Sequence, residues 1–368
     1  MEVNVDLISN GQAQGVVAHQ VALDGELSPG AMRPFVDAAT GGSYISVLKA
    51  GQDPKKAASY HLTQLNTNAT LRRDEWKTLD DAVLMVAETR LNGIADLIEN
   101  GLTYQLGNAM ATTVLEWHDV GDALDAELTM DGVTKGNNDR PNYQHNYLPI
   151  PIIHADYEIN SRALAASRKM GNAMDTTLAE RASRKVNEKL EAMLFTNTDY
   201  AFGAVDSRSR NKIYSYLNHP DRNQIAMTVS WDDSAKTAAQ ILSEVLAMKQ
   251  TSISAKHFGP WMLYIPTAYE TVLDEDYDTT TPGTTIRERI LKIAGIKGVK
   301  VVDTLPDDNV LLVQMTSDVV RLVQGMSIQN VQWQTEGKFI NKYKVMAIQV
   351  PQIRSDQLGN SGVTQLAK

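Results

Sequence analysis

Hydrophobic residues recur every three or four positions between residues 74 and 101, which is the pattern of a helix with one buried face. These apolar positions are Trp76, Leu79, Val83, Val86, Leu91, Ile94, Leu97 and Ile98. Asn100 and Gly101 follow them, and such a pair is typical of a helix C-terminus because both residues accept left-handed backbone angles. We therefore predict one helix across this stretch.

A second long helix is predicted from Thr177. Thr177 and Glu180 have the spacing of a capping box, and Asp175 and Thr176 are acceptable caps as well. Behind the box, apolar residues fall three and four positions apart: Leu178, Ala182, Val186, Leu190 and Met193. This spacing indicates a straight amphipathic helix of about twenty residues, roughly 30 Å long.

Shorter elements fill the rest of the chain. Helices are predicted from Asn160-Ser161, over 267–273 and 285–293, and from Trp231–Ser234 onward with Ala238, Leu242, Val245 and Leu246 on the apolar side. Runs rich in β-branched and aromatic residues predict strands at 113–117, 126–130, 147–153, 157–159, 261–265, 299–302, 310–313, 319–323, 328–334 and 343–350.

Two of these runs predict a projecting ribbon. Pro149 and Pro151 interrupt the returning run, and proline cannot donate to a sheet ladder, so that run belongs to an edge. The tip between the runs is polar and rich in turn formers, among them Lys135, Asn137, Asn138 and Arg140. A hairpin with so little to bury either packs on another body or remains a solvated loop, and the sequence leaves both open.

The two ends of the chain show no sustained period. Residues 1–70 carry seven glycines, and they predict either an extended arm laid on a partner or an irregular lobe folded on its own domain. Residues 354–368 are predicted to be a polar tail.

Composition narrows the class of protein. Hydrophobic residues make up 43% and charged residues 21% of the 368 positions, so the chain can bury a core. There are 0 cysteines, which excludes disulfides and thiolate chemistry. The net charge of −9 argues against a protein that grips DNA through its phosphates. The chain has no long apolar run and no export-signal pattern at its start, so we expect a soluble protein without membrane contact.

No catalytic motif emerges from the sequence. It contains no phosphate-binding loop, no dinucleotide fingerprint and no His-Glu-x-x-His pattern, and the seven histidines form no helical pair. The densest acidic cluster is Asp274-Glu275-Asp276-Tyr277-Asp278, which lacks the central Gly and final Glu of a calcium-binding loop. We interpret it as a solvated loop and predict no catalytic residue, metal or cofactor.

The order of several weak motifs nevertheless resembles a known family. Residues 148–162 lead into Asp175–Ala179 and the long helix, the turn Ile213–Pro220 follows, and then come 264–273 and 285–289. This order is similar to that of tailed-phage major capsid proteins and the related encapsulin shells, over roughly residues 74–355. Ser215 stands where the family's turn usually has Gly.

The resemblance implies an α+β, HK97-like capsid fold with a defined division of the chain. The implied regions are 1–70 as the N-terminal arm, 71–109 as an N-terminal helix region, 110–158 as the extended loop, 159–225 as the spine helix and peripheral domain, 226–318 as the axial domain, and 319–368 as C-terminal strands and tail.

The function implied by the resemblance is structural rather than enzymatic. A major capsid subunit would assemble with itself as pentamers and hexamers into an icosahedral shell, in the host cytoplasm and then in the virion. The shell would enclose double-stranded DNA without reading its sequence, with scaffolding, portal and decoration proteins as further partners. We expect assembly contacts at Lys135, Asn137, Asn138 and Arg140 of the ribbon tip and at Asp274, Glu275 and Asp276 of the axial loop.

Two alternatives to the viral capsid remain. A nanocompartment that encloses an enzyme cargo is the nearest, and the long N-terminal stretch favours the viral capsid over it. An α/β enzyme would use residues 226–318 with the acidic loop as its site. Some phage capsids also join a loop lysine to a neighbour's asparagine, with Asn330 or Asn341 as conceivable acceptors here, but we interpret Lys135 as an exposed turn residue.

Overall fold

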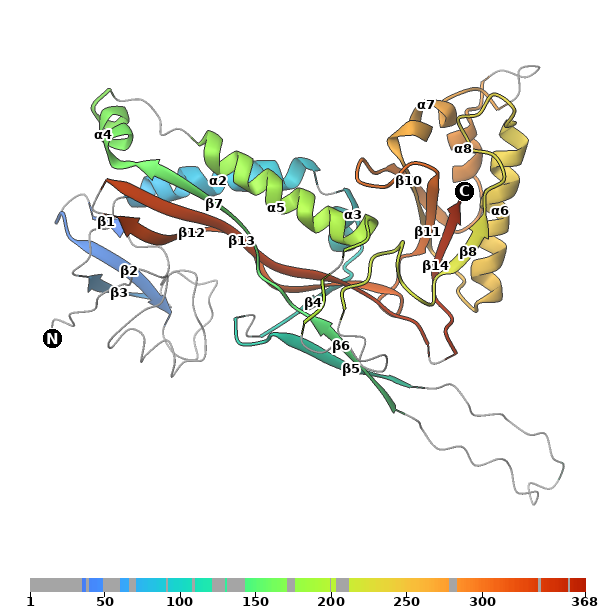
Figure 1. Cartoon of the computed structure of the whole chain (residues 1–368), viewed down its shortest axis with the longest axis horizontal. Coiled ribbons are helices and arrows are strands. Elements are labelled where there is room, and N and C mark those ends of the chain that lie inside the picture. The colour runs from blue at the N-terminus through green and yellow to red at the C-terminus, as the bar shows by residue number, and fades with distance from the viewer. Residues whose placement is uncertain are drawn as a thin grey trace.

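The structure is a computed structural model of the chain. It describes residues 35–37, 40–48, 60–65, 71–90, 92–107, 110–120, 130, 143–170, 176–198, 200–202, 212–277, 283–336, 339–356 and 358–368. Long helices lie along a long β-hairpin, a second helix-and-sheet unit lies at one end of that hairpin, and a two-stranded ribbon projects from below it (Figure 1).

The long hairpin is the centre of a four-stranded sheet. Its strands are β4 (Thr103–Gln105), β7 (Ile153–Asn160), β12 (Val320–Glu336) and β13 (Ile340–Ile353), in the order β4-β12-β13-β7. The runs predicted separately at 319–323 and 328–334 form the single strand β12, whose register shifts around Met326 accommodate the irregular middle of the run.

Two helices cover one face of this sheet, as Figure 1 shows. They are α2 (Arg73–Arg90) and α5 (Thr177–Phe195). Their buried side chains pack on the hairpin, where the ring of Tyr343 stacks on Tyr157 and meets Trp76 edge-on. The predicted apolar positions Val186 and Leu190 of α5 are fully buried in this core.

The long helix α5 begins at Thr177, as predicted, but its N-cap lies one position before the predicted capping box. The N-cap is Thr176, one of the alternative caps named above; its hydroxyl donates to the Glu180 carboxylate at 2.6 Å and accepts no backbone N–H of the first turn. The predicted capping box at Thr177 is therefore wrong, and Leu178 is 44% exposed because the first turn extends past the sheet-facing stripe.

The stretch predicted as one helix contains two, α2 and α3 (Asn92–Glu99), with residue 91 between them outside the described residues. The predicted C-terminus is confirmed. Gly101 has a positive φ of 69°, and the amide of Leu102 donates to the carbonyl of Leu97 at 2.8 Å, which closes the last turn. Ile98 points to solvent, contrary to the predicted stripe.

A five-stranded sheet forms the core of the second unit, which we call the axial unit. Its order is β10-β9-β11-β14-β8, with β8 (Asn223–Ala226), β9 (Trp261–Ile265), β10 (Ile296–Val301), β11 (Asn309–Gln314) and β14 (Val363–Ala367). Strand β14 corrects the predicted polar tail, since Val363 and Leu366 are fully buried between β11 and β8.

Both faces of this sheet are buried, which explains its continuous apolar runs. Along β9, Met262 and Tyr264 face the main core beneath α2 and α5, whereas Leu263 and Ile265 face the helices of the axial unit. The axial unit is therefore fused to the rest of the chain through one face of its sheet.

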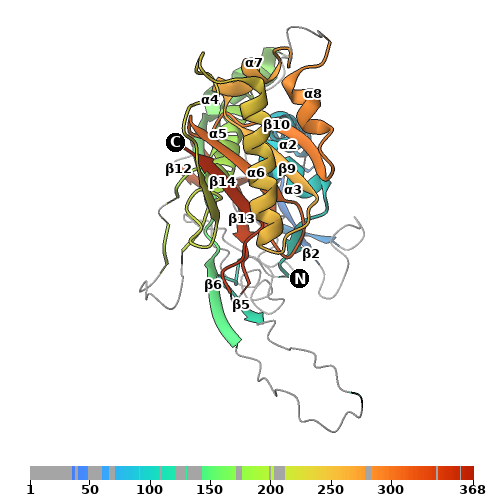
Figure 2. The same cartoon turned by 90° about the vertical axis from the view of Figure 1, so that its right-hand side faces the viewer.

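Helices cover the other face, as the view onto α6 in Figure 2 shows. They are α6 (Ala238–Ser254), a 3-10 turn η3 (Thr267–Tyr269), α7 (Glu270–Leu273) and α8 (Ile286–Leu291). The predicted start of α6 at 231–234 is wrong: Thr237 and Gln240 form its capping box, and Trp231 is a buried core residue ahead of the helix. Leu246, predicted on the apolar side, is 45% exposed.

The predicted short helix after Asn160 is confirmed as α4 (Ser161–Met170), and a small sheet lies near the N-terminus. It contains β1 (Phe35–Val36), β2 (Ser43–Leu48) and β3 (Tyr60–Leu65) in the order β1-β2-β3. Phe35 is buried in the main core, and the amide of Val36 donates to Leu71 at 2.9 Å. These residues thus fold on their own chain, while residues 1–34 of the predicted arm lie outside the described residues.

Candidate functional site: ribbon, axial loop and junction

The ribbon consists of β5 (Val114–Val120) and β6 (Tyr143–Pro149), an antiparallel pair that projects from the body (Figure 1). One of its faces packs on the body through Leu115, Trp117 and the buried Leu148. The opposite face exposes His118 and His145, whose rings meet edge-on at a centroid distance of 4.3 Å. The predicted ribbon is therefore confirmed, but the returning run predicted as one strand over 147–153 is divided between the end of β6 and the start of β7. The strand predicted at 126–130 lies outside the described residues except for Met130.

The residues expected to make contacts at the ribbon tip cannot be placed. Lys135, Asn137, Asn138 and Arg140 all lie outside the described residues. Both conceivable cross-link acceptors can be placed. Asn330 and Asn341 are fully buried, and their amide groups donate to Tyr157 and Ser161 of the same chain. They are thus hydrogen-bonded in the core of the subunit and unavailable to a neighbour's lysine.

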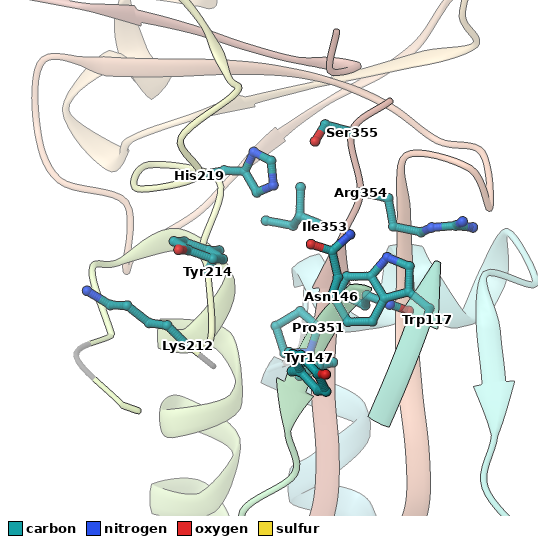
Figure 3. A pocket seen from close by; sticks show the side chains of 12 residues that line it. Trp117, Asn146, Tyr147, Lys212, Tyr214, His219, Pro351, Ile353, Arg354 and Ser355 are labelled. Atoms are coloured by element: carbon teal, nitrogen blue, oxygen red, sulfur yellow. The ribbon is translucent and has the colours of Figure 1, made fainter. Parts of the chain in front are cut away.

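A small hollow lies where the ribbon joins the body. Figure 3 shows Lys212, Tyr214 and His219 on one side of it and Trp117 with Arg354 on the other. His219 belongs to the turn that the resemblance singled out, in which Asn218 accepts hydrogen bonds from the amide of Ser215 at 2.6 Å and from its hydroxyl at 3.2 Å. The enclosed space is about 20 Å³, room for one or two waters at most, so the hollow is no substrate cavity.

The acidic loop lies at the surface of the axial unit. Asp274 forms an ion pair of 2.8 Å with Arg287 of α8, and the carbonyl of Glu275 accepts from the amide of Ile286 at 3.1 Å. Asp276 pairs with Thr285 in an isolated β-bridge. These contacts fasten the loop to α8 and leave the three acidic side chains exposed, so they are accessible to another molecule.

In the described part of the chain, no three His, Asp or Glu side chains are grouped so as to hold a metal ion. Asp278, the last residue of the predicted cluster, lies outside the described residues. Of the helices that the structure describes, none has the length and apolarity needed to cross a membrane.

Sequence reasoning missed a polar junction between the axial unit and the long helix. It is built around α3: the hydroxyl of Tyr264 donates to Asp96 at 3.0 Å, and Lys300 lies 3.5 Å from the same carboxylate. One turn earlier in α3, the amide of Gly93 donates to Glu191 of α5 at 2.9 Å. We call these five residues the junction. No sequence motif marks it, because its members are spread over more than 200 positions.

At the junction, burial and the neighbouring groups act in opposite directions on the pKa of Asp96. Burial raises the pKa of Asp96, and the charge of Lys300 and the Tyr264 hydroxyl lower it in part. Burial likewise raises the pKa of the Tyr264 hydroxyl well above its usual range. The tyrosine is therefore a permanent hydrogen-bond donor to α3.

Comparison with known proteins gives a family and a fold. A family model described as a family of unknown function (DUF6260) matches residues 66–365. The search of curated proteins finds no match.

Solved structures that share the fold include a virus-like particle from Pyrococcus furiosus, with 16% identity and a TM-score of 0.56 over 79% of this chain and 98% of that chain. The capsid of Myoviridae phage XM1 is 7% identical, with a TM-score of 0.55 over 73% of this chain and 90% of that chain. The capsid of a native GTA particle is 12% identical, with a TM-score of 0.54 over 75% of this chain and 91% of that chain. The predicted α+β, HK97-like capsid fold is thus confirmed.

Proposed function

This chain belongs to the family of unknown function DUF6260, and from that premise and its fold we propose that it is a major capsid subunit of a tailed bacteriophage or prophage. Copies of the chain would assemble as pentamers and hexamers into a closed icosahedral shell around double-stranded DNA. The subunit would be a structural protein of the virion, assembled in the host cytoplasm, and not an enzyme.

One observation carries this proposal: a ribbon that leaves the body within a fold shared with shell-forming proteins. Among the described strands, its two arms pair only with each other. One face of the arms packs on the body, whereas the face with His118 and His145 is exposed, and the surface of a second copy would cover it. The acidic loop of the axial unit is exposed, so it could make a second contact between copies, around the five-fold and six-fold axes of the shell.

We assign regions of the chain to this assembly as part of the proposal. Residues 1–70 would be the arm, 71–109 the N-terminal helix region, and 110–158 the extended loop that lies on a neighbour. Residues 159–225 would be the spine and peripheral domain, 226–318 the axial domain around five-fold and six-fold axes, and 319–368 the C-terminal strands. Lys135, Asn137, Asn138 and Arg140 would make ribbon contacts, and Asp274, Glu275 and Asp276 axial ones.

Electron microscopy of the purified full chain tests the proposal. We expect closed particles with icosahedral symmetry, formed by the chain alone or with a co-expressed scaffolding protein. A chain that stays monomeric in sedimentation under every assembly condition would contradict it.

The nanocompartment is the second candidate, favoured by the likeness to the Pyrococcus furiosus virus-like particle, which extends over 98% of that chain. The content of purified particles separates the two. Nuclease-protected DNA, with portal genes beside the coding sequence, supports the phage capsid, whereas a co-purifying enzyme supports the nanocompartment.

A further inference from the structure

Two acidic side chains are buried where the axial unit meets the long helix. Glu191, in the last turn of α5, is 5% exposed, and Asp96 of α3 is 1% exposed. Acidic side chains are almost never buried unless they are paired. Asp96 satisfies this rule, since Tyr264 and Lys300 both contact its carboxylate.

Glu191 is only half satisfied. Its Oε1 accepts from the amide of Gly93 in the first turn of α3, where the helix dipole also favours a negative group. Its Oε2 is buried and has no hydrogen-bond partner in the described part of the chain. An ionised carboxylate with a buried oxygen that lacks a donor is unfavourable, whereas a protonated carboxyl group is neutral.

The charges around Glu191 add to this preference. Asp96 on α3 and Asp303, in the loop after β10, both act on it with negative charge. Tyr216 and Tyr264 contribute neutral phenol groups, and Glu99 lies farther along α3 beside Asp96. The junction's cation, Lys300, is engaged with Asp96 and partly exposed. Every acidic neighbour named here therefore opposes ionisation of Glu191.

The packing at this point is close. A Cβ atom on Gly93 would lie 2.3 Å from a ring carbon of Phe195 and 3.2 Å from Glu191 Oε1. The first turn of α3 therefore lies directly against the last turn of α5, and a small repulsion at the carboxyl group acts on both helices.

We propose that the Glu191 carboxyl group is a proton-operated latch between α5 and α3: the neutral form holds the first turn of α3 against the long helix, and the ionised form releases it. Helix α3 also contacts β9 through Tyr264 and β10 through Lys300. Release of its first turn therefore weakens the packing of the axial sheet against α5.

The direction of the pH dependence follows from the pKa of the buried group. Burial raises the pKa of Glu191 to about 7, the charges of Asp96 and Asp303 raise it as well, and the amides of Gly93 and Ile94 lower it. In the open state the group is solvated and has its ordinary value of 4.5. The closed form therefore binds the proton more tightly, so the latch is firmest in acid and is released as the pH rises through about 7.

Hydrogen exchange of the full-length, unassembled chain tests the latch. The amides of Ile94 to Leu97 are followed from pH 5 to 8, corrected for intrinsic exchange, with the amides of β11 as the internal reference. The two pKa values imply that protection of α3 falls by up to about 70-fold over this range while β11 stays constant. In E191Q the protection of α3 should be independent of pH, because Gln cannot ionise and its amide oxygen still accepts from Gly93.

A second variant separates the latch from a merely structural role. D96N removes one of the opposing charges, so the midpoint of the wild-type transition should move to lower pH. If E191Q fails to fold, the shift of the midpoint in D96N still tests whether Glu191 operates the latch. Protection of α3 that does not change with pH in the wild type, a transition that persists in E191Q, or a midpoint that D96N leaves in place would each overturn the proposal. The latch is a property of the single subunit, so these results do not depend on whether the chain assembles.

Discussion

The hydroxyl of Tyr264 donates a hydrogen bond of 3.0 Å to the carboxylate of Asp96, 168 positions earlier in the chain. This bond ties the axial sheet to α3 and gives a buried acid the donor it needs. Since both groups are almost completely buried, neither can exchange this bond for one to water.

Replacement of Tyr264 by Phe should therefore destabilise the chain. Y264F removes only the hydroxyl and leaves one Asp96 oxygen with a missing donor, so we expect the free energy of unfolding to fall by about 1–3 kcal/mol. Urea unfolding monitored by circular dichroism measures the loss. Y200F is the matched control, because Tyr200 is exposed, and a loss of equal size there would contradict the assigned role.

Glycine 93 should behave opposite to the usual rule for helices. Gly→Ala inside an exposed helix normally stabilises it by about 1 kcal/mol. In G93A the new methyl group would overlap the ring of Phe195, so we expect a net loss of about 1–3 kcal/mol and a lower melting temperature.

Gly107 offers the matched control for this substitution, since a Cβ there meets nothing within 4 Å. Calorimetry of G107A should give a melting temperature close to that of the wild type. If G93A melts at or above the wild-type temperature, α3 does not pack on α5 as described.

The fold was predictable where an element is buried along one face or along both faces. The period of Val186 and Leu190 and the apolar run of β9 both led to correct elements, because one-sided or complete burial leaves a clear pattern in the sequence. The prediction failed at β14, where Thr364 and Gln365 lie between the buried Val363 and Leu366 and give a five-residue strand the composition of a tail.

The junction could not be predicted for a different reason. Asp96 and Glu191 each stand in an amphipathic helix beside other charged residues, so each resembles an ordinary solvated position. They are buried where α3 and α5 approach closely and residues 98 positions apart in the sequence come into contact, and local patterns carry no information on such contacts. Gly93 is the one signal of the junction in the sequence. A glycine inside a predicted helix, away from any turn, indicates that another element packs closely against the helix at that position.

Strand β14 makes a strong prediction about the C-terminal residues. Leu366 is fully buried in the middle of the axial sheet and lies opposite Val310 of β11. L366A should lower the free energy of unfolding by about 2–5 kcal/mol, because it removes buried apolar volume and leaves a cavity. Denaturant titration measures this loss, and L358A is the control, since Leu358 is 70% exposed and its truncation should change stability little.

The exposed acidic loop of the axial unit leads to a prediction about assembly. Glu275 and Asp276 are held in place by the backbone of their loop, and their side chains are exposed. If this loop contacts a basic surface of a second copy, E275K/D276K reverses the charge of the loop, and repulsion between copies should slow or abolish particle formation. The folded subunit should keep its melting temperature, because neither side chain takes part in the ion pair between Asp274 and Arg287.

Light scattering during assembly, with melting curves of the unassembled subunit, separates these two effects. D81K is the matched control, since Asp81 is an exposed acid on α2, outside the axial unit. We expect D81K to assemble at the wild-type rate and E275K/D276K to assemble at least about tenfold more slowly, which corresponds to about 1.4 kcal/mol of barrier. Equal assembly rates for the two variants would show that the axial loop does not contact a second copy and that the axial contact must lie elsewhere on the unit.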